Sequence, residues 1–332
     1  MTSTSRNWPE KPFSLITSTT DLKSIDRLPS DSLGRSEAVR VARLMAQTHN
    51  TIFRAFNAIY NQADSIDPSN KRDVTSFTTF ATFAIDFLEN HHRCEELVFF
   101  PMLEAQAGIP GMMANDVKQH RAFEEPLAEL RDYLRKVHDG TDTLDAAVLR
   151  TCIDILAPEL ERHLRDEIPS ILAAGVHLSD DAMAACYKAL HDEAEGTTDP
   201  FKIGPLVMGC QDNTLLLDGL HIQFPQLPFR FAPHLVHLIV SRRYADVWRF
   251  CPSTFFGEPR DTEFSTPKVE SGCRKASTEE KFRNFRVAAL RQLLTGAIQL
   301  AVLILVLNLM LAACRTWPQE LSWLGRYLVV LE

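Results

Sequence analysis

The sequence predicts an all-α protein, with an up-down-up-down four-helix bundle over residues 36–175 and additional helices after it. Three observations predict this fold class. Four long segments carry apolar residues at three- and four-residue steps, short turn-forming stretches separate them, and no segment alternates like a half-buried β-strand. Four amphipathic helices with short connections pack as antiparallel neighbours, so a bundle is the simplest arrangement.

Each helix of the bundle is indicated by its own apolar stripe and by the turn signal that ends it. The expected helices cover residues 36–63, 74–105, 112–138 and 143–174. A loop at 65–72 ends the first helix, Gly140 follows the third and Gly175 follows the fourth. Pro126 and Pro158 fall inside the third and fourth helices, where the missing N–H predicts a local kink or break.

The segments that flank the bundle differ from it in composition. Residues 1–35 are rich in Ser, Thr, Asp and Pro without a sustained period, which predicts a flexible leader. Residues 176–264 are expected to form a helical extension that packs on the bundle, with helices near 179–195 and 233–250. Residues 265–332 are expected to hold a linker and then an apolar segment.

Charge and cysteine usage exclude some classes of protein. The formal net charge is -8, so we expect no nucleic-acid partner. The seven cysteines are scattered singly, without a C-x-x-C pair, and the N-terminus does not resemble a signal peptide. This pattern predicts free thiols in a reducing compartment, with the bundle in the cytosol.

The most informative pattern is a repeated His-x-x-x-Glu spacing on the apolar faces of the expected helices. The pairs are His91 with Glu95, His120 with Glu124 and His163 with Glu167, and a lone His49 lies on the apolar face of the first helix. Residues four apart lie one turn apart on the same face, so each pair can aim two ligands at one point. A carboxylate inside a bundle is costly unless it is paired, which favours a metal site.

The pattern also occurs twice in the chain. His49 and His91 are 91 − 49 = 42 residues apart, and His120 and His163 are 163 − 120 = 43 apart. One His-x-x-x-Glu pair alone is more often an ordinary solvated helix face. Three pairs in register with apolar stripes, duplicated along the chain, favour a centre of imidazoles and carboxylates, which suits iron or manganese.

At these residues the chain resembles the hemerythrin-like, or HHE cation-binding, family. The resemblance rests on the segment HHRCEELVFFP at residues 91–101. It implies two non-haem iron ions and dioxygen as the partner. One iron would be held by His49 and His91 and the other by His120, Glu124 and His163, with Glu95 and Glu167 bridging the two.

The chain departs from oxygen-carrying members of this family at two positions. Those members have histidine where this chain has Glu124. They also have an aspartate five residues after the fourth-helix histidine, whereas this chain has Glu167 four residues after it. His92 with Glu96 is an alternative pair one residue further on.

A separate apolar segment lies near the C-terminus. Residues 293–314 carry no charge and, as a helix, span roughly a bilayer core. Seven basic residues between 268 and 291 precede the segment and two follow it, which predicts membrane anchoring with the bundle in the cytosol. The alternative is a long apolar helix docked on the bundle, favoured by Gln299 and Asn308 near its middle.

The function that we expect is a non-haem di-iron protein that binds or senses oxygen or a related small ligand, with iron storage as an accompanying role. We expect a binding protein rather than a dedicated enzyme. The alternative is a di-iron oxidase, peroxidase or ferroxidase, which Glu124 favours because a carboxylate-rich centre tends to activate oxygen. A second alternative is a metal-free scaffold anchored at a membrane.

Overall fold

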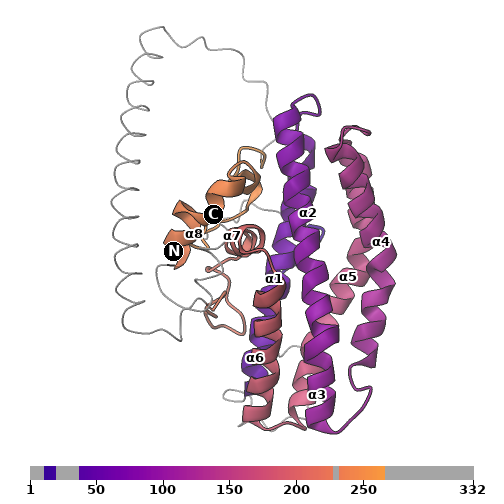
Figure 1. Cartoon of the computed structure of the whole chain (residues 1–332), viewed down its shortest axis with the longest axis vertical. Coiled ribbons are helices and arrows are strands. Elements are labelled where there is room, and N and C mark those ends of the chain that lie inside the picture. The colour runs from indigo at the N-terminus through magenta and orange to yellow at the C-terminus, as the bar shows by residue number, and fades with distance from the viewer. Residues whose placement is uncertain (1–10, 20–36, 227–231, 266–332) are drawn as a thin grey trace. The chain divides into compact units, whose positions relative to one another are not determined.

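The bundle consists of four long helices that lie side by side (Figure 1). The computed structural model describes residues 11–19, 37–226 and 232–265. Its bundle helices are α1 (Glu37–Gln62), α2 (Lys71–Cys94), α4 (Ala114–His138) and α5 (Ala146–Gly175). Each of α1 and α4 packs against both α2 and α5, and consecutive helices are joined by short connections, so neighbours run antiparallel. The described residues contain no β-strand, and the expected all-α bundle is confirmed.

The ends of the helices follow from local sequence. The Asn70 side chain accepts a hydrogen bond from the Asp73 N–H and caps α2, and the Asp145 carboxylate does the same for α5. Gly140, with φ of 74°, follows α4 in the left-handed conformation that a side chain would disfavour. The expected breaks do not occur, because α4 runs through Pro126 and α5 runs through Pro158.

The second helix is interrupted by one π-helical turn, η3 (Glu95–Phe99), before it continues as α3 (Phe100–Ala107). The Phe100 N–H donates to the Glu95 carbonyl five residues back. Pro101 has no N–H and cannot make the usual bond to the carbonyl of Leu97, so the backbone widens here. The sequence predicts one continuous helix over 74–105, and the difference lies at the residues that carry the family motif.

Part of the predicted leader is an ordered strap on α1, so the prediction of a flexible leader is wrong for residues 11–19. Phe13 is fully buried and stacks on Phe53 with ring centroids 4.9 Å apart. The Asn57 side chain bonds to both backbone groups of Phe13, and Asn50 bonds to both backbone groups of Ile16. Apolar burial and two amide side chains therefore hold a segment that has no secondary structure of its own.

The extension after the bundle packs on α1 and α2. It consists of α6 (Asp180–Thr197), α7 (Pro200–Cys210), α8 (Ala232–Leu238) and the 3-10 helices η4 (Val240–Tyr244) and η5 (Val247–Phe250). Phe250 packs edge-on against Phe77 of α2, and Trp248 packs against Phe83. The helix expected over 233–250 is instead divided into three short pieces, which turn the chain so that its aromatic residues reach α2.

The apolar segment 293–314 lies outside the described residues. Within the described part of the chain, no helix has both the length and the apolar character needed to cross a membrane.

Candidate metal centre

The four bundle helices aim a set of histidines and glutamates at the middle of the bundle. The buried side chains are His49 from α1, His91 and His92 from α2, Glu95 from the π turn, His120 from α4, and His163 and Glu167 from α5. They fall into two groups, each compact enough to hold one metal ion. The two groups share one residue, Glu95.

The first group joins α1, α2 and α5. His49 Nε2 lies 3.1 Å from His91 Nε2 and 3.2 Å from a carboxylate oxygen of Glu167. His91 Nε2 lies 3.0 Å from Glu95 Oε1. Two imidazoles and two carboxylates therefore meet at one point, and His49, Glu95 and Glu167 are fully buried there.

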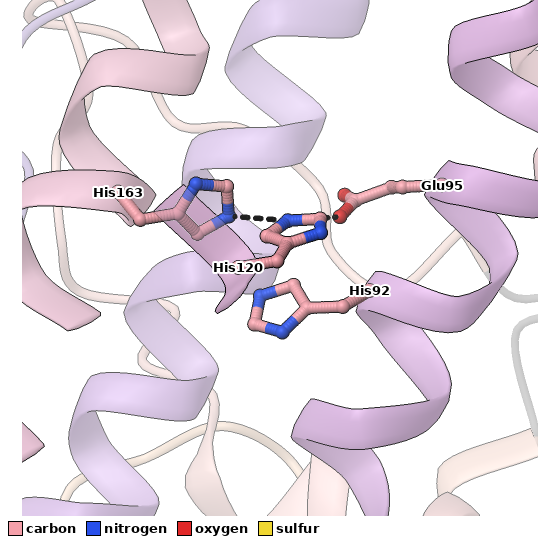
Figure 2. Close-up of side chains that lie close together, drawn as sticks. All are labelled: His92, Glu95, His120 and His163. Carbon is pink, nitrogen blue, oxygen red and sulfur yellow. Dashed lines mark hydrogen bonds and ion pairs between the residues drawn. The ribbon is translucent and has the colours of Figure 1, made fainter. Parts of the chain in front are cut away.

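The second group joins α2, α4 and α5, and its three imidazole rings lie close together beside Glu95 (Figure 2). His120 Nε2 lies 2.9 Å from His163 Nε2 and 3.7 Å from Glu95 Oε2. The His92 ring stacks beside His120 with centroids 4.2 Å apart. This group consists of three imidazoles and the shared carboxylate, so it has one more imidazole and one fewer carboxylate than the first.

The shared carboxylate makes a dinuclear arrangement. Glu95 directs Oε1 to the first group and Oε2 to the second. His91 and His92 are adjacent on α2, and successive helical residues point about 100° apart, so one helix serves both groups. A glutamate that offers one oxygen to each of two ions is the bridging arrangement of carboxylate bundle centres.

Outer partners fix the orientation of three ligand histidines. His49 Nδ1 donates to the Leu164 carbonyl at 2.6 Å, and His120 Nδ1 donates to the Glu96 carboxylate at 2.7 Å. His163 Nδ1 lies 3.4 Å from Gln119 Oε1. A carbonyl oxygen only accepts, so each Nδ1 carries the proton and each Nε2 presents a lone pair to the centre. Such outer partners are typical of metal-binding histidines.

Burial sets the charge state of the centre. It lowers the pKa of His91, His92 and His163 well below the usual range, and neighbouring imidazoles lower them further. Burial, and then the nearby Glu167 carboxylate, raise the pKa of Glu95 well above its usual range. These three histidines are therefore biased to the neutral form that binds a cation, whereas Glu95 is biased to its protonated form until a positive charge arrives.

The residues fit a bound cation better than they fit each other. The two carboxylate oxygens of Glu95, the two of Glu167 and His92 Nε2 are buried without a hydrogen bond of good geometry. The Nε2 lone pairs of His120 and His163 face each other at 2.9 Å, which repels unless a cation lies between them. Buried unpaired groups of this kind are destabilising, and a metal ion would satisfy all of them.

The structure differs from the predicted ligand set at Glu124, which is exposed on α4 and belongs to neither group. The buried stripe of α4 steps three residues from His120 to Phe123, so the next position faces outward. On α5 the stripe steps four residues from His163, and Glu167 points inward.

His92, which the sequence offers only as an alternative, occupies the second group, while its expected partner Glu96 bonds to His120. Glu167 belongs to the first group alone.

Iron content should distinguish the two candidate ligands of the second group. We expect His92→Ala to lower the iron content from about two ions per chain to about one. We expect Glu124→Ala to leave it unchanged, because that side chain points to solvent. Iron would be measured after anaerobic reconstitution with ferrous iron and removal of loose metal. Loss of iron in Glu124→Ala with retention in His92→Ala would contradict this assignment.

Comparison with known proteins identifies the family of the bundle that holds this centre. The hemerythrin HHE cation binding domain matches residues 40–174, which include all of these side chains. The dimeric xanthone biosynthesis cluster protein R11 of Cryptosporiopsis sp. (strain 8999) is 32% identical over 228 residues, 68% of this chain and 84% of the relative. No solved structure matches the chain significantly. The domain match across the bundle and this relative show that the chain belongs to the hemerythrin-like, HHE cation-binding, family.

Proposed function

We propose that the chain holds two non-haem iron ions and binds dioxygen or a related small ligand at them. The observation that carries the proposal is the pair of ligand groups joined through Glu95. Mixed imidazole and carboxylate donors without a thiolate favour iron or manganese. When bound, the iron pair supplies electrons and an open coordination position for dioxygen.

The composition of the centre supports binding over oxidation of a substrate. With Glu124 facing solvent, the groups contain five histidines and two glutamates. A carboxylate-rich centre would stabilise the ferric state, whereas neutral imidazoles add no negative charge. Burial excludes bulk water, and the outer partners of His49, His120 and His163 keep their rings in place through a change of iron charge.

Reversibility is the test of this proposal. The full chain would be loaded with ferrous iron without oxygen, mixed rapidly with dioxygen, and then degassed while its visible spectrum is followed. We expect an absorption band that forms with oxygen and disappears under vacuum over repeated cycles. One-way conversion to a ferric spectrum would overturn oxygen binding as the function, and negligible iron would overturn the iron centre itself.

A second candidate is a di-iron oxidase that acts on an organic compound. It is favoured by the relative's description as a biosynthesis cluster protein. One-way oxidation in the same experiment, accelerated by an added organic substrate, would support it.

We also propose that the bundle works in the cytosol. The support is that the five cysteines of the described part, Cys94, Cys152, Cys186, Cys210 and Cys251, are all free thiols. Thiol labelling of the chain, denatured directly from intact cells, tests this, because most of these thiols are buried in the fold and only cysteines paired in an oxidising compartment would then resist the reagent.

A further inference from the structure

A cavity of about 210 Å³ lies outside the bundle core, where α6, α7 and residues 224–226 cover α1 and α2. It is larger than a cavity of about 150 Å³, which is enough to bind benzene. The packing of α6 and α7 beside α1 and α2 can be followed in Figure 1. The extension therefore builds a second feature next to the metal centre, with room for a ligand of one or two rings.

The cavity reaches the metal centre at His91. This side chain lines the cavity and is 8% exposed, whereas His49, Glu95 and Glu167 of the same group are fully buried. His91 directs Nε2 to the first group, so its other ring nitrogen, Nδ1, lies on the opposite side of the ring. A molecule in the cavity would contact a ligand of the centre without entering the bundle.

His91 lacks the outer partner that orients other ligand histidines. The Nδ1 atoms of His49, His120 and His163 each face an oxygen of the protein. In the described residues no such oxygen faces Nδ1 of His91 or of His92, and of these two only His91 lines the cavity. With Nε2 used for metal, Nδ1 carries a proton, and this cavity-lining residue therefore offers a donor that no described protein oxygen accepts.

The rest of the lining indicates the chemical class of the occupant. Most of the wall is apolar or aromatic, with these side chains among it: Met45, Phe87, Tyr187, Leu190, Ile203 and Phe224. Asn90 also lines the cavity, and its Oδ1 is held by Arg93 and Thr197, so the amide NH₂ remains as a second donor. The lining also contains His191 and Glu195, which lie 3.8 Å apart, and no lysine or arginine is among the described lining residues. The Glu195 carboxylate disfavours a ligand that carries a carboxylate of its own.

We propose that this cavity binds a small uncharged aromatic carbonyl compound, whose oxygen accepts the hydrogen bond from His91 Nδ1. The aromatic and methionine side chains stack on the ring, and Asn90 of the same lining offers a donor to a second oxygen. The ligand then takes the place of the missing outer partner of His91, so its binding alters the iron environment. This coupling rests on the proposed iron centre, whereas binding to the cavity does not.

The test compares acetophenone with α-methylstyrene, which has the same shape but a CH₂ group in place of the carbonyl oxygen. Both would be titrated into the full chain by calorimetry, with and without iron. We expect acetophenone to bind about 2- to 10-fold more tightly, the value of one neutral hydrogen bond. In the iron-loaded chain we expect acetophenone, and not α-methylstyrene, to shift the ferric absorption band.

Two variants make the test specific to the cavity. Ile203→Trp fills the cavity from α7 and should weaken acetophenone binding at least tenfold. Ile155→Trp is the control and should not weaken it, because Ile155 lies on α5 outside the cavity and is 55% exposed. Leu190→Trp fills the same cavity from α6, so it tests the proposal independently if Ile203→Trp fails to fold. Iron content on the same samples separates the two proposals. A chain that loads iron but binds acetophenone no better than α-methylstyrene, or binds it equally after filling, overturns the cavity proposal alone.

Discussion

Glu95→Gln is expected to remove both irons from the centre and, at the same time, to stabilise the metal-free bundle by an amount that grows as pH rises. The first effect follows because Glu95 is the one residue that belongs to both ligand groups. Loss of an outer partner alone weakens metal binding about 10- to 100-fold, and a lost bridging ligand should cost more than that. The iron content should therefore fall well below that of a variant that loses a ligand from one group.

The second effect follows from the sign of the pKa shift. The folded metal-free chain raises the pKa of Glu95, so the protonated carboxyl is favoured. This contribution to stability is complete below the unfolded pKa, about 4.3, and is lost as pH rises through the raised value. Glutamine has nearly the same shape and cannot ionise, so Glu95→Gln does not undergo this loss.

Thermal unfolding of the metal-free proteins from pH 5.5 to pH 8.5 measures the effect. The difference in melting temperature between Glu95→Gln and the wild type should increase with pH. Glu125→Gln is the matched control, because Glu125 is exposed on α4 and the substitution is chemically the same. A difference that is flat across this range would show that Glu95 is not a buried carboxyl with a raised pKa.

The positions of most candidate ligands could be predicted because helical spacing carries three-dimensional information. His49 pairs with His91, and His120 pairs with His163, as the duplicated spacing of the sequence suggests. Helix period alone does not distinguish a three-residue step from a four-residue step, however. On α4 the inward stripe goes from His120 to Phe123, and this single step turns Glu124 to solvent.

The role of His92 depends on two features that helical spacing hides. Adjacent residues on one helix point about 100° apart, and α2 lies between two ion groups, so His91 and His92 can each serve a different group. The π turn at Glu95–Phe99 also begins at the shared ligand Glu95, and it shifts the faces of the residues that follow relative to a regular helix. Pro101 is the signal in the sequence for this π turn, since a proline six residues after Glu95 removes a regular helical hydrogen bond.

The strap and the cavity could not be predicted because they depend on contacts between distant segments. Phe13 is held by residues of α1 forty or more positions away, as the separation of 44 between Phe13 and Asn57 shows. The cavity takes its lining from α1, α2, α6, α7 and residues 224–226. No periodic pattern links these segments, so the free side of His91 becomes visible only when the extension is placed against α2.

Removing iron from the wild-type chain is expected to lower its melting temperature by about 8–16 °C. A ligand at about 1,000 times its dissociation constant stabilises the folded state by about 4 kcal/mol, and each kcal/mol corresponds to about 2–4 °C in a domain of this size. The physical source is the set of buried groups without hydrogen bonds, on Glu95, Glu167 and His92, which a bound cation satisfies.

The size of this decrease should depend on pH. The lowered pKa values of His91, His92 and His163 mean that stability from these groups is lost as pH falls below about 6.5, in the iron-loaded and the metal-free chain alike. Iron must also displace the proton that the raised pKa of Glu95 favours, so iron binding weakens as pH falls. The difference between iron-loaded and metal-free melting temperatures should therefore be larger at pH 7.5 than at pH 5.5.

The double variant His91→Ala, His163→Ala provides the control, since it removes one histidine from each ion group. It should melt at the same temperature with and without iron, because the remaining side chains no longer surround either position. If iron instead stabilised this variant as much as it does the wild type, the metal would bind elsewhere. If neither protein responded to iron and both melted alike, the buried histidines and glutamates would serve only to pack the bundle, and the scaffold alternative would replace the iron centre.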